Sequence, residues 1–326
     1  MYLLAKTFLF SLDAELAHNL TLKLSKFIVR SPLSFFVKQK RVNKPFKLLG
    51  LEFPNKVGLA AGMDKNAECL EVWDALGFGF IEVGTVTPKA QVGNPKPRLF
   101  RLKNKNAIIN RMGFNNHGVD NLISNLEKSK FSGILGINIG KNKTTPEEKA
   151  ADDYIFCLRK VYKYADFITI NISSPNTPDL RKLQFGEALD NLLSELNNEK
   201  DNLVKIAPDL TQDEVISLTK SFIKYNINGV IATNTTNSRE KVVGEENANE
   251  TGGLSGKPLE DASNIVIKTL RENLPENFPI IGVGGIMDSE SGKAKLEAGA
   301  NLVQIYTGLI YKGPELVGHL ANKLQN

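Results

Sequence analysis

The stretch Phe167-Ile168-Thr169-Ile170-Asn171-Ile172-Ser173-Ser174-Pro175-Asn176-Thr177-Pro178 joins an apolar, β-branched run to a polar loop. The first four residues predict a short buried strand. Hydroxyl and amide side chains then gather where the strand ends, and the two prolines stiffen the loop by restricting its backbone. Such a segment is typical either of an ordinary turn or of a site that grips a flat polar molecule.

The same order of an apolar run, a polar loop and a helix-like stretch repeats along the chain after residue 50. We expect strands at residues 57–61, 80–84, 133–139, 167–172, 203–207, 229–233, 279–283 and 302–306. We expect helices at residues 67–76, 145–164, 186–196, 211–225, 259–270 and 289–297, the fourth of them starting with a capping box. Strands that alternate with helices indicate a parallel sheet, and about eight such units favour an α/β fold of the closed (β/α)8 TIM-barrel type.

A doubly wound open sheet is the alternative to a barrel. That fold favours a Gly-x-Gly-x-x-Gly turn after its first strand. The first expected strand leads instead into Ala60-Ala61-Gly62-Met63-Asp64-Lys65, which lacks this glycine spacing. The sequence therefore favours the barrel.

Two connections are longer than a simple crossover needs. Residues 85–132 contain two short runs, 98–102 and 107–110, that we expect to pair as a hairpin. Residues 234–277 contain the glycine-rich run 251–256, which we expect to be a mobile or ligand-facing loop. Long connections in compact domains are usually lids or binding loops.

The composition is that of a soluble globular protein, and no apolar run approaches the length of a membrane span. Its two cysteines have no metal-ligand spacing, and its three histidines are far apart, so we predict no metal site. The net charge of +5 is uneven: residues 1–47 hold nine Lys/Arg and two acidic residues, or +7, and the remaining 32 basic and 34 acidic residues give −2. This asymmetry indicates an anionic partner for the N-terminal segment, either a membrane surface or a nucleic acid.

Active sites of barrels lie where the strands end. The expected strand ends here are rich in amides, hydroxyls and glycines, with few carboxylates. Glycines after the last two strands, at Gly284, Gly285 and Gly308, are typical of a phosphate-binding backbone or of tight turns. Lys65 and Lys205 have three interpretations: a Schiff-base nucleophile of a lyase or aldolase, a group that stabilises charge on a cofactor, or a structural ion pair.

The chain also resembles a known family along nearly its whole length. The matching segments, in order, are Gly58–Lys65, Glu82–Pro88, Asn110–Asn116, Gly136–Lys143, Asn171–Pro178, Lys205–Asp209, Ala232–Thr236 and Gly282–Ile286. These motifs resemble those of the dihydroorotate dehydrogenases, in particular the membrane-associated class that uses a quinone. The resemblance implies a flavin-dependent β/α barrel that oxidises dihydroorotate to orotate in de novo pyrimidine biosynthesis.

The resemblance implies a role for each matching position. Ser174 matches the catalytic base, and hydride passes to bound FMN. The substrate-binding positions are Lys65, Asn110, Arg111, Met112, Gly113, Phe114, Asn171, Asn176, Asn234 and Thr235. The cofactor-binding positions are Ala61, Gly62, Met63, Asp64, Lys65, Thr85, Asn138, Asn171, Lys205, Thr233, Gly256, Gly284, Gly285, Tyr306 and Thr307.

Two details bear on the class. Soluble members of the family place cysteine at the base position, and neither Cys69 nor Cys157 falls near Ser174, which favours the quinone-using class. Met63 stands where the family pattern has leucine, a mild apolar exchange. Asparagine suits the proposed substrate because its amide pairs a donor with an acceptor, as an imide ring does.

Residues 1–47 form the first of two expected domains, and residues 48–326 form the barrel. Asp13 can cap a helix that places Leu16, Leu20 and Leu24 along one face, within a basic surrounding. From the residues alone, a membrane-surface helix and a plug of the barrel bottom are equally consistent, while a signal peptide or a nucleic-acid arm fits less well.

The resemblance favours the membrane, because a lipid-soluble quinone must reach the flavin from the bilayer. It implies a peripheral protein on the cytoplasmic side of a bacterial-type cell membrane, without a mitochondrial targeting segment. It also suggests His18 and Arg101 as contacts on the quinone side.

Overall fold

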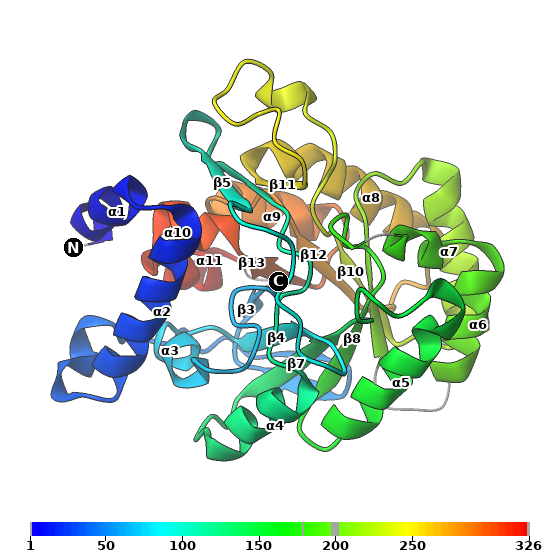
Figure 1. Ribbon diagram of the computed structural model, residues 1–326, viewed down its shortest axis with the longest axis horizontal. Helices are drawn as coiled ribbons and strands as arrows, with labels where there is room; N and C mark the ends of the chain where they lie inside the picture. The colour runs from blue at the N-terminus through cyan, green and yellow to red at the C-terminus, as the bar shows by residue number, and fades with distance from the viewer. Residues whose placement is uncertain (1, 178, 197–201, 325–326) are drawn as a thin grey trace.

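The computed structural model describes residues 2–177, 179–196 and 202–324, and a closed barrel of parallel strands lies at its centre (Figure 1). Within the described residues the barrel has eight strands, in the spatial order β10-β12-β13-β3-β4-β7-β8-β9. Their bounds are β3 Val57–Leu59, β4 Phe80–Val86, β7 Ile134–Ile139, β8 Phe167–Asn171, β9 Asn202–Ile206, β10 Gly229–Ala232, β12 Ile280–Val283 and β13 Leu302–Ile305. The (β/α)8 barrel expected from the sequence is therefore confirmed, and the open sheet is excluded.

Helices surround the barrel and connect its strands, as Figure 1 shows. They are α3 Leu70–Ala75, α4 Val119–Lys128, α5 Ala150–Val161, α6 Gly186–Leu196, α7 Gln212–Lys224, α8 Glu260–Asn273, α9 Ser289–Glu297, α10 Thr307–Lys312 and α11 Glu315–Lys323. The capping box before α7 is confirmed: the Thr211 hydroxyl accepts the Glu214 N–H, and the Glu214 carboxylate accepts the Thr211 N–H. The sequence analysis did not predict α4, α10 or α11.

The signal for α4 was present in the sequence. Val119, Leu122 and Leu126 recur at helical spacing, and the first two are buried while the third packs against the core. The helix lies inside the long connection after β4, for which the sequence analysis predicts only a hairpin.

Aromatic and aliphatic side chains fill the lower part of the barrel. The ring centroids of Phe53 and Phe80 lie 5.2 Å apart, and those of Phe80 and Phe167 lie 6.2 Å apart. Gly58 makes room for this layer, because a Cβ there would lie 2.3 Å from the Phe80 ring. Burying each such phenylalanine contributes about 2–3 kcal/mol to folding. The end of the barrel at which the strands begin is therefore filled by core side chains. Space for a ligand is left at the end where the strands finish.

A short antiparallel hairpin, β1 (Phe46–Leu48) and β2 (Leu51–Phe53), covers this lower end. Phe53 is fully buried against the barrel core, and Phe46, Leu48 and Leu51 pack beside it. The plug role considered for residues 1–47 thus belongs to this hairpin. The predicted domain boundary after Lys47 falls inside β1.

A second sheet lies beside the barrel, with the strand order β11-β6-β5. The hairpin expected before residue 111 is confirmed as β5 (Leu99–Leu102) and β6 (Ala107–Asn110). The glycine-rich run predicted as a loop is mostly a strand, β11 (Gly253–Gly256), which pairs with β6. Its glycines allow close packing: a Cβ on Gly253 would lie 1.8 Å from the Thr235 hydroxyl oxygen.

The N-terminal segment forms α1 (Tyr2–Ser11), α2 (Ala14–Val29) and a 3-10 turn, η1 (Pro32–Phe36), outside the barrel wall (Figure 1). The cap predicted at Asp13 is confirmed, since its carboxylate accepts the Leu16 N–H at 2.9 Å. Leu16, Leu24 and Phe27 are exposed on α2, whereas Leu20 is half-buried. Pro178, one of the two stiffening prolines predicted after β8, lies outside the described residues.

Candidate active site

A cavity lies at the carboxyl ends of the barrel strands, and residues that follow β3, β8, β10, β12 and β13 line it. Most of the residues predicted for a site come together here. They are Ala61, Gly62, Lys65, Thr85, Asn110, Met112, Gly113, Phe114, Asn171, Ser174, Asn176, Lys205, Thr233, Asn234, Thr235, Gly256, Gly284, Gly285, Tyr306 and Thr307. The walls thus combine these amides, hydroxyls, glycines and two lysines with apolar side chains such as Leu99, Ile108 and Ile305.

Four predicted positions do not line this cavity. Met63 is buried beside it, and the Asp64 carboxylate is occupied by the Trp73 indole N–H at 3.1 Å and by two backbone N–H groups. The Arg111 guanidinium points to an ion pair with Glu250, at 2.5 Å. Asn138 is fully buried one layer below the cavity. Met63 and Asp64 border a second cavity instead.

Buried amides and hydroxyls form a continuous network at the floor of the cavity. The Asn171 amide donates to the Thr85 hydroxyl at 3.0 Å and to the Asn138 carbonyl oxygen at 3.1 Å. Thr85 donates to the same Asn138 oxygen at 2.5 Å. Because each member is fixed by another, the donors and acceptors that face the cavity have set directions.

Glu82 and Gln304 complete this network, and the sequence analysis assigned neither of them to the site. The Glu82 carboxylate, fully buried in β4, accepts the Asn138 amide at 2.8 Å and the Gln304 amide at 2.6 Å. Gln304 lines the cavity, and its side-chain oxygen has no hydrogen-bond partner in the structure. A polar residue inside an otherwise apolar strand was the available signal in both cases.

A second group of amides lies on the loops above. The Asn176 amide donates to Asn110 Oδ1 at 3.1 Å, and the Asn234 amide donates to the Ser173 hydroxyl at 3.1 Å. The Ser174 hydroxyl accepts the Asn176 N–H at 3.2 Å and is largely buried. Residues 174–176 therefore form a tight turn that directs one serine and one asparagine into the cavity.

The two lysines of the cavity, Lys65 and Lys205, are shielded from water, unlike lysines on the protein surface. The Lys65 ammonium donates to the Gly62 carbonyl at 2.9 Å, and its pKa is lowered to about 8, first by burial and then by the nearby Arg98. Burial also lowers the pKa of Lys205, while the carboxylate of Glu82 opposes that shift. A buried cation of this kind favours an anionic or electron-rich partner in the cavity.

Glycines shape the wall beyond the last two strands. Gly284 has φ +118° and Gly285 has φ +82°, and a Cβ on Gly285 would lie 2.4 Å from the Cα of Glu260. The Ser255 and Thr307 hydroxyls lie 2.8 Å apart at the same end. This end offers backbone N–H groups and hydroxyls to a ligand, with no carboxylate among the lining residues. In the part of the chain that the structure describes, no cluster of three or more His, Cys, Asp or Glu side chains is arranged to hold a metal ion.

His18 and Arg101, the residues suggested for a quinone side, occupy different surroundings. His18 borders a second cavity, together with Glu15, Lys65 and Arg98, and burial lowers its pKa to about 4. The Arg101 guanidinium donates to the carbonyls of Leu9 and Leu12 at the end of α1 and lies 4.6 Å from the Phe10 ring centroid.

Comparisons with known proteins agree with the geometry. A family model described as dihydroorotate dehydrogenase matches residues 45–326. A relative from Idiomarina loihiensis named dihydroorotate dehydrogenase (quinone) is 56% identical over an alignment of 335 positions, which covers 99% of this chain and 100% of that protein. A relative from Aliivibrio fischeri strain MJ11 with the same name is 54% identical, and the alignment again covers 99% of this chain and 100% of that protein.

Solved structures show the same similarity in three dimensions. The crystal structure of DHODH from Eimeria tenella in complex with ferulenol superposes with a TM-score of 0.88 at 36% identity, covering 95% of this chain and 90% of that one. The ligand-free form from the same organism also has a TM-score of 0.88, at 37% identity, and covers 96% and 94% of the two chains.

Proposed function

The chain belongs to the dihydroorotate dehydrogenase family, and from this we propose that it oxidises dihydroorotate to orotate and passes the electrons to a quinone. It is an oxidoreductase of that family. Relatives that align with it over their full length are named dihydroorotate dehydrogenase (quinone). The single observation that carries the proposal is the convergence of Ser174, Lys65 and a ring of asparagine amides on one cavity.

FMN is the proposed hydride acceptor, and the residues present fit it. Gln304 offers an unpaired buried oxygen, Lys205 a buried ammonium, and Gly284 and Gly285 a backbone wall without side chains. These groups suit, respectively, a ring N–H, the edge of a ring that becomes negative on reduction, and a phosphate. When bound, FMN supplies the two-electron acceptor that the amino-acid side chains lack.

Ser174 is the proposed base that takes the proton from C5 of dihydroorotate. A serine hydroxyl is a weak base in water, so its setting has to help it. Burial shields the hydroxyl from bulk water, and the N–H that Asn176 donates orients its oxygen and would stabilise the alkoxide form that accepts the C5 proton. Asn110, Asn176 and Asn234, with Thr235, are proposed to hold the ring and carboxylate of the substrate by paired donors and acceptors.

Lys65 is proposed to bind the anionic substrate and to contact the flavin. Its ammonium lies at the mouth of the loop after β3, with one hydrogen bond to a carbonyl, which leaves two N–H donors for ligands. Because its pKa is only about 8, the charge that attracts the substrate is present at neutral pH and is lost in mild alkali.

We propose that the N-terminal segment, residues 1–47, attaches the protein to a membrane surface and gives the quinone access. Leu3, Leu4, Phe8, Leu24 and Phe27 are more than half exposed on α1 and α2. The segment carries a net charge of +7. Exposed apolar side chains with a basic surrounding favour the interface of an anionic membrane. A helix that could cross a bilayer is not found among the described residues.

The function is tested with purified protein. We expect it to bind FMN, to bleach the flavin absorbance when dihydroorotate is added without oxygen, and to recover the absorbance when a short-chain quinone follows. Protein that takes up FMN but is not reduced by dihydroorotate would contradict the substrate. Reduction followed by no reaction with quinone would contradict only the acceptor.

A further inference from the structure

Three barrel loops meet at the side chain of Arg181, which lies in the 3-10 turn η4 (Leu180–Gln184) after β8. Its Nε donates to the Ser173 carbonyl at 3.0 Å, and one Nη donates to the Thr235 carbonyl at 2.8 Å. The other Nη forms an ion pair with Asp209 at 2.7 Å. One guanidinium therefore links the loops that follow β8, β9 and β10.

Asp209 extends this link with both of its oxygens. The carboxylate accepts the Thr236 hydroxyl and the Asn237 N–H, the latter at 3.1 Å and 3.3 Å to its two oxygens. Asp209 belongs to one of the segments that carry the family resemblance, yet it does not line the cavity. Its role is thus left unexplained by substrate or cofactor contact.

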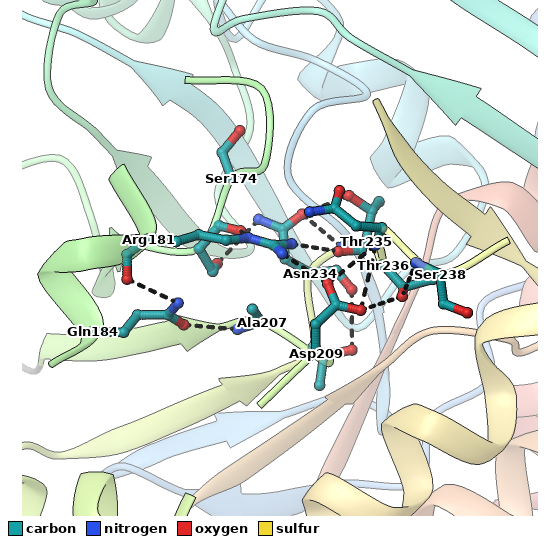
Figure 2. Close-up of polar contacts among 12 residues, drawn as sticks. Ser174, Arg181, Gln184, Ala207, Asp209, Asn234, Thr235, Thr236 and Ser238 are labelled. Atoms are coloured by element: carbon teal, nitrogen blue, oxygen red, sulfur yellow. Dashed lines mark hydrogen bonds and ion pairs between the residues drawn. The ribbon is translucent and has the colours of Figure 1, made fainter. Parts of the chain in front are cut away.

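A glutamine adds a third tie at the base of the same turn. The Gln184 side chain, almost fully buried, accepts the Ala207 N–H at 2.9 Å, and its amide reaches the Arg181 carbonyl at 3.4 Å. This bond holds η4 against the end of β9, the strand that carries Lys205. Figure 2 shows this network as one connected set of contacts.

The carbonyls that Arg181 holds belong to Ser173 and Thr235. Ser173 directly precedes the proposed base Ser174, and Thr235 is a proposed substrate contact. Figure 2 shows the Ser174 side chain apart from the network, with its hydroxyl pointing away from Arg181. The guanidinium thus grips the backbone of both loops while the reacting side chains stay free to face the cavity.

The geometry of the contacts argues for arginine in particular. A planar guanidinium directs several donors at fixed angles, which a lysine ammonium cannot reproduce. The side chains of Arg181 and Asp209 are 21% and 28% exposed, so the pair is partly shielded from water. An isolated exposed ion pair would contribute little, but this one shares its atoms with two backbone carbonyls and a neighbouring loop.

We propose that Arg181, with Asp209 as its counter-ion, is a positioning residue that sets the placement of Ser174 relative to Thr235. The inference rests on the proposed function, because it assigns to these two loops the base and a substrate contact. Fixed separation between a base and the group that holds its substrate is what makes proton removal fast, and misplacement of about 1 Å can cost roughly 100-fold in rate.

The test compares three variants of the full-length, FMN-loaded protein. Arg181→Lys keeps the charge but loses the planar set of donors, and Asp209→Asn keeps the shape but loses the charge. Arg271→Lys is the matched control, because Arg271 also clamps carbonyls, those of Gly299 and Phe278 at 2.9–3.1 Å, in the segments that precede β12 and β13. It therefore acts at the opposite end of the barrel from the cavity.

Each variant is measured for FMN affinity, orotate affinity, thermal midpoint, and the rates of flavin reduction by dihydroorotate and of reoxidation by quinone. For Arg181→Lys we expect reduction to slow about 10- to 100-fold and orotate to bind several-fold more weakly, with FMN affinity and reoxidation unchanged. Asp209→Asn should change the same quantities in the same direction. Arg271→Lys should lower the thermal midpoint without changing the reduction rate or orotate affinity.

The double variant sharpens the test. Because Arg181 and Asp209 act as one unit, the combined variant should slow reduction by less than the product of the two single effects. The proposal would be overturned if Arg181→Lys had the same reduction rate and the same orotate affinity as the wild-type protein, whatever its thermal midpoint. If Arg181→Lys does not fold, unchanged reduction in Asp209→Asn overturns it instead.

The wild-type protein separates this proposal from the one it rests on. Reduction of the wild-type flavin by dihydroorotate establishes the activity before any variant is compared. Failure of that first step contradicts the proposed function, whereas normal kinetics in the two variants contradict only the positioning role of Arg181.

Discussion

At the residue scale, the cavity is built from short side chains whose directions are set by their neighbours. Asn171, Thr85 and Asn138 fix one another below, and Ser174 is oriented by the N–H of Asn176 above. Short side chains lose little rotational freedom when ordered, so such a site is prepared before its ligand arrives. The chemistry then depends on the few donor and acceptor atoms that face the cavity, since the other polar atoms of these residues are already hydrogen-bonded within the protein.

Replacing the proposed base tests the chemistry directly. Ser174→Ala should slow flavin reduction by dihydroorotate about 10²- to 10⁴-fold, because no other group would take the C5 proton, while orotate should still bind. Stopped-flow absorbance measures the reduction rate. Ser173→Ala is the neighbouring control: it loses the hydrogen bond that the Ser173 hydroxyl accepts from Asn234 and the one that it donates to Asn171, and it should slow the reaction far less. Equal effects of the two substitutions would contradict the assignment to Ser174.

The pKa of Lys65 predicts a pH dependence. As the pH rises through about 8, Lys65 loses its proton, so anionic orotate should bind about 10-fold more weakly at pH 9 than at pH 7. In Lys65→Met this change should be absent, and calorimetric titration with orotate at several pH values measures both proteins. A pH dependence retained in Lys65→Met would assign it to another group.

The same shift has a consequence for stability, with a definite sign. The pKa of Lys65 is about 8 in the folded protein and has its ordinary value of 10.5 in the unfolded chain. Between these pH values the unfolded chain binds more protons, so the stability of the folded state rises with pH across this window. Burial of the charged lysine therefore costs stability at neutral pH, which is consistent with a residue kept for binding.

At the element scale, turns and strand ends determine where ligands fit. β11 replaces what would be a flexible loop, and its glycines bring the backbone against Thr235 and Asn106. The turn after β12 packs Gly285 against the first residue of α8. These close approaches leave no room for side chains, so the backbone itself forms the wall of the cavity at Gly256 and Gly285.

A methyl group at Gly285 should weaken FMN binding. In Gly285→Ala the new Cβ meets Glu260 at 2.4 Å from a backbone with φ +82°, so the turn must move, at a cost of about 1–3 kcal/mol. We expect FMN affinity to fall by roughly 10- to 100-fold, measured by the flavin fluorescence released on dilution. The control is Gly318→Ala in α11, where a Cβ meets nothing within 4 Å. FMN affinity in Gly285→Ala as high as in that control would contradict the phosphate assignment.

At the scale of the whole molecule, the N-terminal segment, which carries both basic and exposed apolar side chains, packs against the side of the barrel. Glu15 of α2 accepts two hydrogen bonds from the Arg98 guanidinium, at 2.8 Å and 3.0 Å, and both side chains are buried. Tyr2 and Lys6 of α1 donate to the carbonyls of Ile310 and Tyr311 in α10. The outer face of the segment keeps Leu4, Phe8 and other large apolar side chains exposed.

Removing residues 2–37 should separate the role of the N-terminal helices from that of the barrel. The cut leaves the strap 39–44, which is held by the Gln39 N–H to Ala75 and by Lys44 to Asn322, and it leaves the β1–β2 hairpin intact. We expect the shortened protein to retain FMN and its reduction by dihydroorotate. Sedimentation with anionic vesicles and turnover with a long-chain quinone should both be lost.

Two results would contradict this assignment. One is full-length protein that does not sediment with anionic vesicles, and the other is a shortened protein that turns over long-chain quinone at the full rate. Loss of FMN on truncation would show instead that the segment is needed to fold the barrel. Circular dichroism of both proteins distinguishes a folding defect from the loss of a surface.

The sequence predicted the order of elements well, and its errors have identifiable causes. The eight strands, the hairpin, the Asp13 cap and the Thr211 capping box depend on local patterns, so each was predicted near its observed place. The glycine-rich run was misread because glycine serves both flexibility and close packing, and only the neighbour Thr235 distinguishes them. Helix α4 was missed inside a long connection.

For the site, the residues at strand ends were predictable and their supports were not. Alternation of strands and helices by itself determines that the carboxyl ends of the strands meet at one edge, so polar residues there had to converge. Only the closed barrel decides that Glu82 holds Asn138 and Gln304, and that Arg181 reaches Asp209 and Thr235. Those contacts join residues far apart in the chain, and a local pattern carries no information about a partner that folding alone brings near.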